Sequence, residues 1–416
     1  MPTSKSATIR SKVRRNYDAR PYPSDDETAL TKNRWRIAPL EWITALWRST
    51  HDDVLPRRIL VAGCGTGSEA FSLQRRLPAA RIVAVDFSAR SIAVARRLAQ
   101  RAPEMRGIRF VVADLASPKL GTKVGRRFDL ISCHGVLSYV PEPERALRNV
   151  ARCLAPDGAL YLGVNGATHA SVGWRQVLTT FGFNVEDFRD SRHLREILRA
   201  CDAMSFHRGK DRIFTKPPAY LASDIFCSFI HNLPLAEWLR VVRAAGLSLR
   251  GSYSFGSSLR PLCDENLTRV LMPRSREQIC ELEDMLVPAS FHRLLLTQQP
   301  SASAPWTDPN ALLAWRPIRT RLHETTLPAR GRSWHALRTV RCTSAATNTR
   351  IDLRIPEWEV EILRKSDGTR PVRDMLGKIP AHIPARLLRE QLYLLYLLIV
   401  INLLPPARDA ASSQTA

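Results

Sequence analysis

Apolar and polar positions alternate along the middle of the chain in a way that predicts a layered α/β domain. Short apolar runs, typical of buried strands, occupy residues 58–62, 81–85, 108–112, 128–132 and 159–164. Apolar residues recur at helical spacing before the first run, over 35–48, and between the runs, over 68–76, 88–101 and 143–154, with a turn expected at 155–158. Strands and helices that alternate at these lengths predict a doubly wound, mostly parallel sheet with helices on both faces.

The pattern is less regular at the N-terminus and in one internal stretch. Residues 1–33 are polar and turn-rich and are predicted to form an N-terminal arm. Alternation stops over about 166–233, which we interpret as a helical insertion that includes a helix at 185–200. It resumes with a helix at 235–245, a strand at 247–255, a helix at 275–286 and a strand at 291–297. The α/β domain is therefore predicted to span 34–298.

The rest of the chain is predicted to be a linker followed by a small domain. Residues 299–350 begin with a stretch rich in Ser, Pro and Ala and are interpreted as a linker and irregular segment. Helices expected at 357–365, 371–379 and 384–403 predict a small, mainly helical domain over 351–406. Residues 407–416 are interpreted as a tail.

Composition and charge add little to this prediction of the fold and say little about partners. The formal net charge of +23 permits a nucleic-acid partner, but the arginines are scattered along the chain, so this partner is not favoured. Eight cysteines form no C-x-x-C pair, so no zinc site, other metal site or disulfide framework is indicated. The basic N-terminus lacks the apolar core of a signal peptide, and the apolar stretch 392–404 is too short to span a bilayer. A cytoplasmic protein without a transmembrane segment is expected.

The loop after the first strand contains the glycines that are predicted to contact a ligand. Gly63, Gly65 and Gly67 allow the backbone to turn sharply and to approach a ligand closely. Asp86 ends the second strand, 19 residues beyond Gly67, where a carboxylate can accept hydrogen bonds from both ribose hydroxyls. This pattern alone would also serve a dinucleotide. Asp114 ends the third strand, where it can accept a hydrogen bond from an adenine amino group.

Five successive motifs give this sequence a specific resemblance to a known family. They are Val61-Ala62-Gly63-Cys64-Gly65-Thr66-Gly67, Asp86, Ala113-Asp114, Phe128-Asp129-Leu130-Ile131 and Leu154-Ala155-Pro156-Asp157-Gly158. In this order they resemble class I methyltransferases, whose fold is a seven-stranded Rossmann-like sheet and whose methyl donor is S-adenosyl-L-methionine. The resemblance implies a cofactor site made of Gly63, Cys64, Gly65, Thr66, Gly67, Asp86, Phe87, Ser88, Asp114 and Leu115, with His134 and Tyr17 as further candidates.

The stretch from Gly135 to Pro143 resembles the G-V-L-H-H-L-x-D-P segment of one methyltransferase group, with two departures. Ser138 and Tyr139 stand where that group has two histidines, so the role of those imidazoles does not transfer. His134 just before the segment is a candidate base, although a single histidine at a strand end is more often structural. The catalytic candidates are therefore His134, Tyr139 and, at the end of the fifth strand, Asn165.

Both termini resemble parts of known bacterial methyltransferases. Residues 16–23 resemble a Y-E-x-x-P-Y-P arm, which would either cover the cofactor with Tyr17 or Tyr22 or lie extended against the core. Residues 355–359 and 363–369 resemble the winged-helix module appended to certain protein-lysine methyltransferases. Such a module would dock a protein substrate, stabilise a dimer or bind nucleic acid.

The acceptor of the methyl group is predicted to bind beside the insertion, because ligands of such sheets bind at the carboxyl ends of the strands. Asn165, His169, Tyr220 and Asp224 are the polar candidates there. The Pro-Pro-aromatic signature of amino-methylating nucleic-acid enzymes is absent after the fourth strand. The sequence therefore favours a methyltransferase acting on a protein side chain or a small metabolite. The alternative is a nucleic-acid-binding or regulatory protein in which the methyltransferase fold is secondary.

Overall fold

The computed structural model describes most of the chain as two compact units. The described residues are 4–23, 39–47, 55–184, 190–204, 213–253, 270–272, 274–298, 304–320, 323–331, 333–344, 350–376 and 383–406. The first unit comprises Met1–Ala38, Pro56–Leu247 and Val287–Arg293, and the second comprises Pro39–Leu55, Ser248–Leu286 and Leu294–Ala416. Residues 24–33 of the predicted arm, 185–189 of a predicted helix, 299–303 of the predicted linker and the predicted tail lie outside the described residues.

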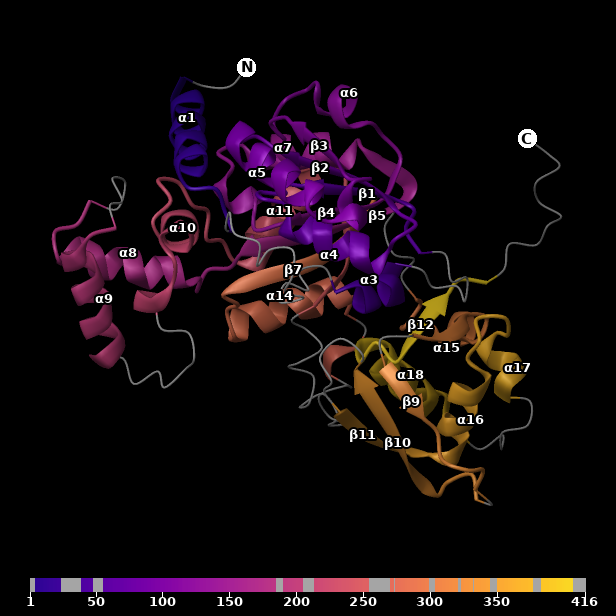
Figure 1. Cartoon of the computed structure of the whole chain (residues 1–416). Coiled ribbons are helices and arrows are strands. Elements are labelled where there is room, and N and C mark those ends of the chain that lie inside the picture. The colour runs from indigo at the N-terminus through magenta and orange to yellow at the C-terminus, as the bar shows by residue number, and fades with distance from the viewer. Residues whose placement is uncertain are drawn as a thin grey trace. The chain divides into compact units, whose positions relative to one another are not determined.

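A seven-stranded sheet with the order β3-β2-β1-β4-β5-β7-β6 confirms the predicted fold class (Figure 1). The strands are β1 (Arg58–Ala62), β2 (Arg81–Asp86), β3 (Arg109–Val112), β4 (Phe128–His134), β5 (Leu154–Asn165), β6 (Ser248–Ser252) and β7 (Phe291–Thr297). The pairs formed among β1 to β5 are parallel, and β6 runs antiparallel to β7. Consecutive residues of β1 are buried, as expected for a strand covered on both faces.

Helices connect the parallel strands in two groups. The first group is α4 (Ser68–Arg76) and α5 (Ala89–Gln100), and the second is α6 (Leu120–Val124), α7 (Pro143–Ala151) and α11 (Leu235–Ala244). The first group leads from β1 outward to β3, and the second leads in the opposite direction across the sheet. Because parallel crossovers are right-handed, the two groups cover opposite faces. The strand order therefore reverses between β1 and β4, which is where such sheets bind ligands.

Residues 4–19 form a helix, α1 (Ser4–Ala19), where the sequence predicted a polar, turn-rich arm. The prediction was wrong for this segment because the apolar stripe of the helix is narrow. Ile9, Val13 and Tyr17, spaced four residues apart, pack with Tyr139 and Cys227, while basic residues dominate the other positions. The predicted turn at 155–158 lies inside β5, where the register between β4 and β5 shifts.

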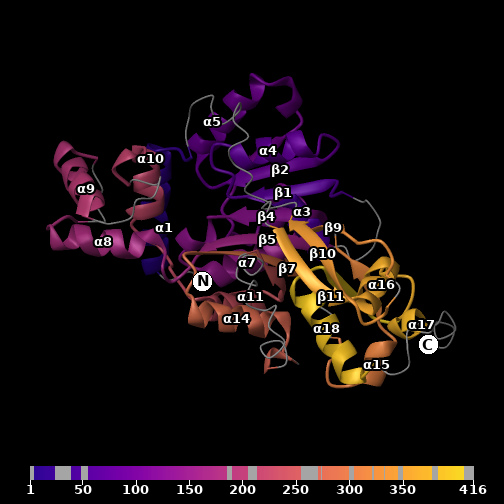
Figure 2. The ribbon, with the colours of Figure 1, turned by 90° about the horizontal axis from the view of Figure 1, so that it is seen from below.

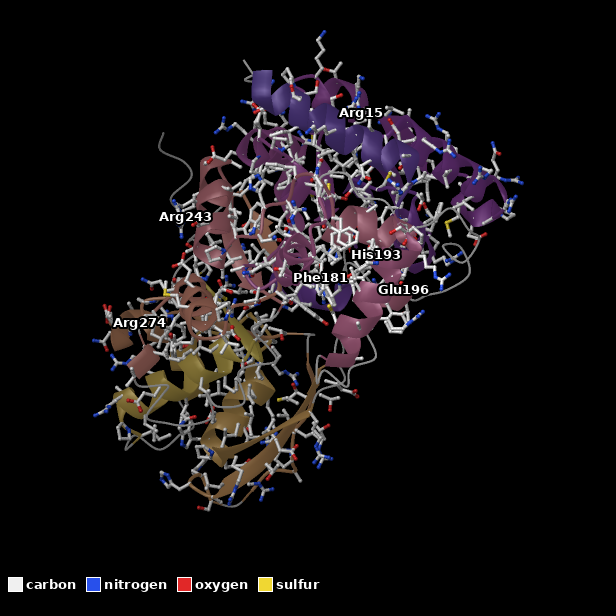
Figure 3. All side chains as sticks on the ribbon, turned by 90° about the vertical axis from the view of Figure 1, so that its left-hand side faces the viewer. Arg15, Phe181, His193, Glu196, Arg243 and Arg274 are labelled. Carbon is white, nitrogen blue, oxygen red and sulfur yellow. The ribbon has the colours of Figure 1, made fainter. Side chains whose placement is uncertain are left out.

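The described part of the insertion is helical. It contains α8 (Ala170–Thr180), α9 (Arg192–Met204), α10 (Pro218–Tyr220) and a single π-helical turn at Leu221–Ile225. Figure 3 labels His193 and Glu196 on α9. Leu178, Leu194, Leu198 and Leu221 form the centre of a separate apolar cluster. Figures 1 and 2 both show α1 beside α10, so the N-terminal helix and the insertion lie next to each other.

The second unit contains α3 (Leu40–Trp47), α14 (Arg276–Leu286) and the C-terminal region. That region comprises α15 (Pro309–Leu313), β8 (Arg316–Arg319), β9 (His323–Thr326), β10 (Leu337–Ser344), β11 (Arg350–Pro356), α16 (Glu357–Lys365), α17 (Val372–Leu376), α18 (Ala385–Leu397) and β12 (Ile401–Leu404). The guanidinium of Arg276 lies 4.0 Å from the ring centre of Tyr396 and donates to its carbonyl. This contact joins α14 to α18, so the compact units do not divide at the predicted linker.

One expectation for the C-terminal region was wrong. The predicted linker and irregular segment at 299–350 contains β8, β9 and β10. Within 351–406, helices α16, α17 and α18 contain more residues than strands β11 and β12, as predicted for a mainly helical domain, and those strands pair with the strands of the predicted linker. The sequence did not predict these strands because the alternation of apolar and polar residues is short: Val340 and Cys342 are its buried members in β10, and Leu353 and Ile355 in β11. The helix expected to continue to residue 403 ends at Leu397. None of the described helices is long and apolar enough to cross a membrane.

Replacing Trp238 by Phe is expected to destabilise the first unit by about 1–3 kcal/mol. Trp238 is fully buried on α11, and its indole nitrogen donates to the carbonyl of Asn165 at 2.8 Å. Phenylalanine leaves that buried carbonyl without its indole donor. Urea unfolding followed by circular dichroism measures the change. Phe181→Leu, at a residue 53% exposed, is the control and should shift stability by no more than about 0.5 kcal/mol. Equal shifts in the two variants would contradict the assignment.

Candidate functional site

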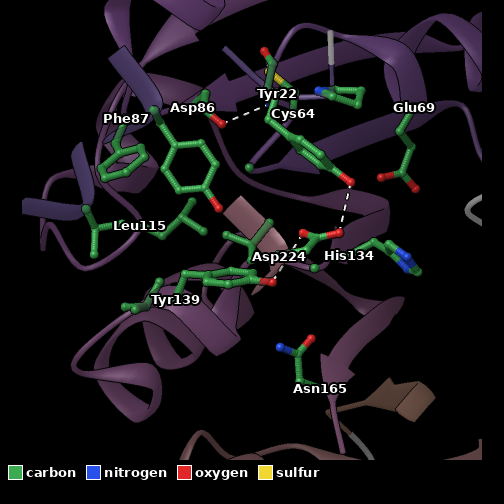
Figure 4. Close-up of a pocket in the computed structure, with 18 of the residues that line it drawn as sticks. Tyr22, Cys64, Glu69, Asp86, Phe87, Leu115, His134, Tyr139, Asn165 and Asp224 are labelled. Carbon is green, nitrogen blue, oxygen red and sulfur yellow. Dashed lines mark hydrogen bonds between the residues drawn. The ribbon is translucent and has the colours of Figure 1, made fainter. Parts of the chain in front are cut away.

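A cavity of about 260 Å³ lies in the first unit at the carboxyl ends of the parallel strands (Figure 4). Of the predicted cofactor residues, those that line it are Gly63, Cys64, Gly65, Asp86, Phe87, Asp114, Leu115, His134 and Tyr17. Tyr139, Asn165, His169 and Asp224 also line it. Thr66, Gly67, Ser88 and Tyr220 are not among the lining residues. One cavity thus brings together segments from residue 10 to residue 291.

Two sets of backbone contacts, one with Val85 and one with Tyr22, shape the glycine loop. The N–H groups of Gly63 and Cys64 both donate to the carbonyl of Val85, which ties the loop to the end of β2. Gly65 has φ +51°, and a β-carbon there would lie 2.3 Å from the carbonyl oxygen of Tyr22. The N–H of Thr66 donates to the same oxygen at 3.0 Å. A residue with a side chain at position 65 would therefore push the arm away from the loop.

Asp86 is held by backbone donors. Its two carboxylate oxygens accept from the N–H groups of Gly65 and Ser88, each at 2.9 Å. Burial raises the pKa of Asp86, and these two hydrogen bonds oppose the rise. Ser88 itself acts away from the cavity: its hydroxyl donates to Asp18 at 2.6 Å and accepts from the N–H of Ser91, which caps α5. Ser88 therefore anchors the N-terminal helix.

Asp114 lies at one end of the cavity with apolar and aromatic neighbours. One of its oxygens accepts from the N–H of Ala116 at 2.8 Å, and the other lies 3.3 Å from the guanidinium of Arg10, on α1. Arg10 also pairs with Glu142. The ring of Tyr17 meets that of Phe87 edge-on, with centres 5.9 Å apart. Aromatic and apolar side chains thus line the cavity together with a carboxylate acceptor.

Asp224 lies on the π-helical turn and joins three parts of the chain. Its carboxylate accepts from the hydroxyl of Tyr22 at 3.1 Å and from that of Tyr139 at 3.3 Å (Figure 4). Burial raises the pKa of Asp224 to about 6, while both hydroxyl donors oppose the rise. The ring of Tyr17 lies edge-on to that of Tyr139 at 6.4 Å. A carboxylate that accepts hydrogen bonds from two tyrosine hydroxyls thus lines the cavity.

His134 and His169 have surroundings that fit structural roles. His134 stacks on Tyr161, with ring centres 5.7 Å apart, and its Nδ1 lies 3.2 Å from the Tyr161 hydroxyl. Burial lowers the pKa of His134 to about 3, so the imidazole is neutral and a weak base at pH 7. His169 caps α8 by accepting from the N–H of Ser171, and burial lowers its pKa to about 4. Neither histidine is poised to take a proton at neutral pH.

The sequence did not single out Glu69 or Arg10, which both line the cavity. Glu69 follows the glycine loop directly, and its side chain accepts a hydrogen bond from the hydroxyl of Ser132. The only available signal was its position, two residues beyond Gly67, which is also an ordinary position for an acid in the first turn of a helix. Arg10 offered no signal, because it is one of many arginines in the N-terminal segment.

Residues 60–160 match the model of a family described as "Methyltransferase domain". Residues 60–160 form a methyltransferase domain. The match covers β1 to most of β5 and includes the glycine loop, Asp86 and Asp114. It agrees with the ordered motifs found in the sequence and with the seven-stranded sheet.

Several known proteins are similar to parts of this chain. An uncharacterized protein of Synechococcus sp. is 37% identical over 284 residues, covering 63% of this chain and 65% of that protein. A ubiquinone biosynthesis O-methyltransferase of Xanthomonas oryzae is 30% identical over 155 residues, covering 35% of this chain and 62% of the enzyme. The chain thus spans less than two thirds of the length of these relatives.

A solved structure shares the fold of the chain. The structure of PKMT2 from Rickettsia typhi in complex with AdoHcy is 14% identical, with a TM-score of 0.52, and the alignment covers 88% of this chain and 75% of that one. This likeness shows that the two chains share a fold.

Replacing Gly65 by Ala is expected to release the N-terminal segment from the methyltransferase domain. The new β-carbon would collide with the carbonyl of Tyr22, and the positive φ adds about 1–3 kcal/mol of strain. Hydrogen exchange followed by mass spectrometry should show α1 exchanging at least about tenfold faster, while β1 to β5 stay protected. Gly107→Ala, where nothing lies within 4 Å of the added carbon, is the control. Equal protection of α1 in both variants would refute the contact.

Proposed function

We propose that the chain is an S-adenosyl-L-methionine-dependent methyltransferase whose cofactor occupies the cavity described above. The observation that carries the proposal is the joint placement of the glycine loop, Asp86 and Asp114 around one cavity within a methyltransferase domain. When bound, this cofactor supplies a methyl group on a positively charged sulfur. The protein must then position an acceptor in line with that group, which contributes up to roughly 7–11 kcal/mol when geometry is ideal.

The residues present fit this cofactor. Each carboxylate oxygen of Asp86 accepts one backbone N–H and keeps a second lone pair, so both can accept from ribose hydroxyls. Asp114 can accept from the adenine amino group, while Phe87 and Leu115 provide the apolar wall that a flat base requires. At Gly65 the loop lies close to Tyr22, so both backbone segments border the cavity without a side chain between them.

We infer that the acceptor binds beside Asp224. A buried carboxylate flanked by Tyr22 and Tyr139 suits a protein side chain or small metabolite that donates hydrogen bonds, and the aromatic rings suit one with a positive charge. An acceptor whose nucleophilic atom carries a proton would have to release that proton once the methyl group had passed to it from the sulfur, which would keep the electron pair of the broken carbon–sulfur bond. With a pKa of about 6, Asp224 is mostly ionised at pH 7 and can receive that proton.

The C-terminal region is proposed to recruit a partner. The order of α16, α17 and α18 followed by β12 supports the resemblance to a winged-helix module, which would dock a protein substrate or a second copy of the chain. Nucleic-acid binding and a regulatory role form the less favoured alternative, because the excess positive charge is spread along the sequence. The described cysteines are free thiols, which supports a cytoplasmic setting.

Asp86→Ala is expected to weaken binding of S-adenosylmethionine at least tenfold, about 1.4 kcal/mol. The substitution removes the acceptors for both ribose hydroxyls. Isothermal titration calorimetry measures the dissociation constant. Asp374→Ala, at an exposed carboxylate of the second unit, should bind with unchanged affinity. If Asp86→Ala also binds like the wild type, the cofactor does not occupy this cavity.

Asp224→Asn is expected to lower methyl transfer at least about tenfold while leaving the dissociation constant of the cofactor within twofold. Asparagine keeps the shape and one hydrogen-bond acceptor but can neither carry the charge nor take a proton. Label from S-adenosylmethionine, incubated with cell extract, is counted separately in protein, nucleic acid and small molecules. Asp190→Asn, in the insertion but paired with Arg195 at 2.6 Å, is the matched control. Loss of cofactor binding together with activity would place Asp224 in the cofactor site.

A further inference from the structure

Glu69 is a buried acid that faces the cavity. It lies in the first turn of α4, directly after the glycine loop, and is 7% exposed. The hydroxyl of Ser132, on β4, donates to one of its oxygens. Neither the fold nor the roles proposed above for Asp86, Asp114 and Asp224 make use of this carboxylate.

The described residues supply Glu69 with no positive partner. No Lys, Arg or His side chain of the described chain forms an ion pair with it. Burial raises the pKa of Glu69 to about 7, and the Ser132 hydroxyl is the only group that opposes the rise. A buried carboxylate without a cation is energetically unfavourable, and a ligand that brings a cation to it gains the corresponding stabilisation.

The position of Glu69 indicates which part of the cofactor it meets. Figure 4 shows Glu69 and His134 on the opposite side of the drawn pocket from Phe87 and Leu115. An adenosine bound between Asp86, Phe87 and Leu115 therefore directs its amino-acid end toward Glu69. Burial lowers the pKa of His134 to about 3, so the imidazole is neutral and does not supply a positive charge to pair with Glu69. Asp224 is already held by two tyrosine hydroxyls.

We propose that Glu69 binds the α-ammonium group of the methionine portion of the cofactor. The inference rests on the proposed function and assigns a binding residue, with no bond made or broken. It predicts that the protein distinguishes ligands by the presence of that ammonium group.

The experiment compares two ligands on two proteins. S-adenosylhomocysteine carries the ammonium group, whereas 5′-methylthioadenosine keeps the adenosine and the sulfur but lacks the amino acid. Calorimetry with Glu69→Gln should show S-adenosylhomocysteine binding at least about tenfold more weakly than to the wild type, and methylthioadenosine binding within twofold. Glutamine has the shape of the neutral acid, so the thermal unfolding midpoint should be unchanged. Asp86→Ala is the control, because it should weaken both ligands.

A second measurement does not depend on how a variant folds. The wild-type protein is titrated with an S-adenosylhomocysteine analogue in which hydrogen replaces the amino group, and a loss of at least tenfold is expected. Equal affinity for the two compounds, or a Glu69→Gln effect of the same size on methylthioadenosine, overturns the role of Glu69. If the wild type binds none of these ligands, the proposed function itself fails, which is a separate result.

Discussion

The absence of a side chain at Gly65 is the constraint on which the cavity depends. The backbone there meets the carbonyl of Tyr22 on one side and donates to Asp86 on the other. Three segments that are distant in sequence thus converge on one peptide unit: the N-terminal segment, the loop after β1 and the end of β2. Asp86 in turn accepts from Ser88, whose hydroxyl holds Asp18 of α1. The loop therefore shapes the ligand site and fixes the segment that closes it.

The electrostatics of the cavity differ from those of the whole chain. The protein has a formal net charge of +23, yet the lining includes Asp86, Asp114, Asp224, Glu69 and, among its described arginines and lysines, only Arg10. Asp86, Asp224 and Glu69 are held by N–H or O–H donors rather than by cations. Such a lining suits a ligand that carries a positive charge, as the proposed cofactor does on its sulfur.

The sequence predicts what depends on continuous local patterns. The strands β1, β2 and β7 and the helices α4 and α16 stand at or within one residue of their expected bounds, since long apolar runs or clear helical spacing define them. The sequence does not predict elements that have few apolar residues, such as α1 and β10. It also does not predict functional roles that arise from contacts between distant segments. Asp224 was one of several polar candidates in the insertion, and its meeting with Tyr22 and Tyr139 depends on chain segments about 85 and 200 residues away.

The placement of α1 has a consequence for how the protein is made. The ribosome produces this helix before β1 to β5 and the insertion, but a helix of 16 residues with a narrow apolar stripe has little stability in isolation. Its partners include Asp114 and Ala222, the latter accepting from Asn16 at 2.9 Å. This helix can therefore dock only after more than 200 further residues have been synthesised. The cavity is complete only once a segment made before its partners has packed against them.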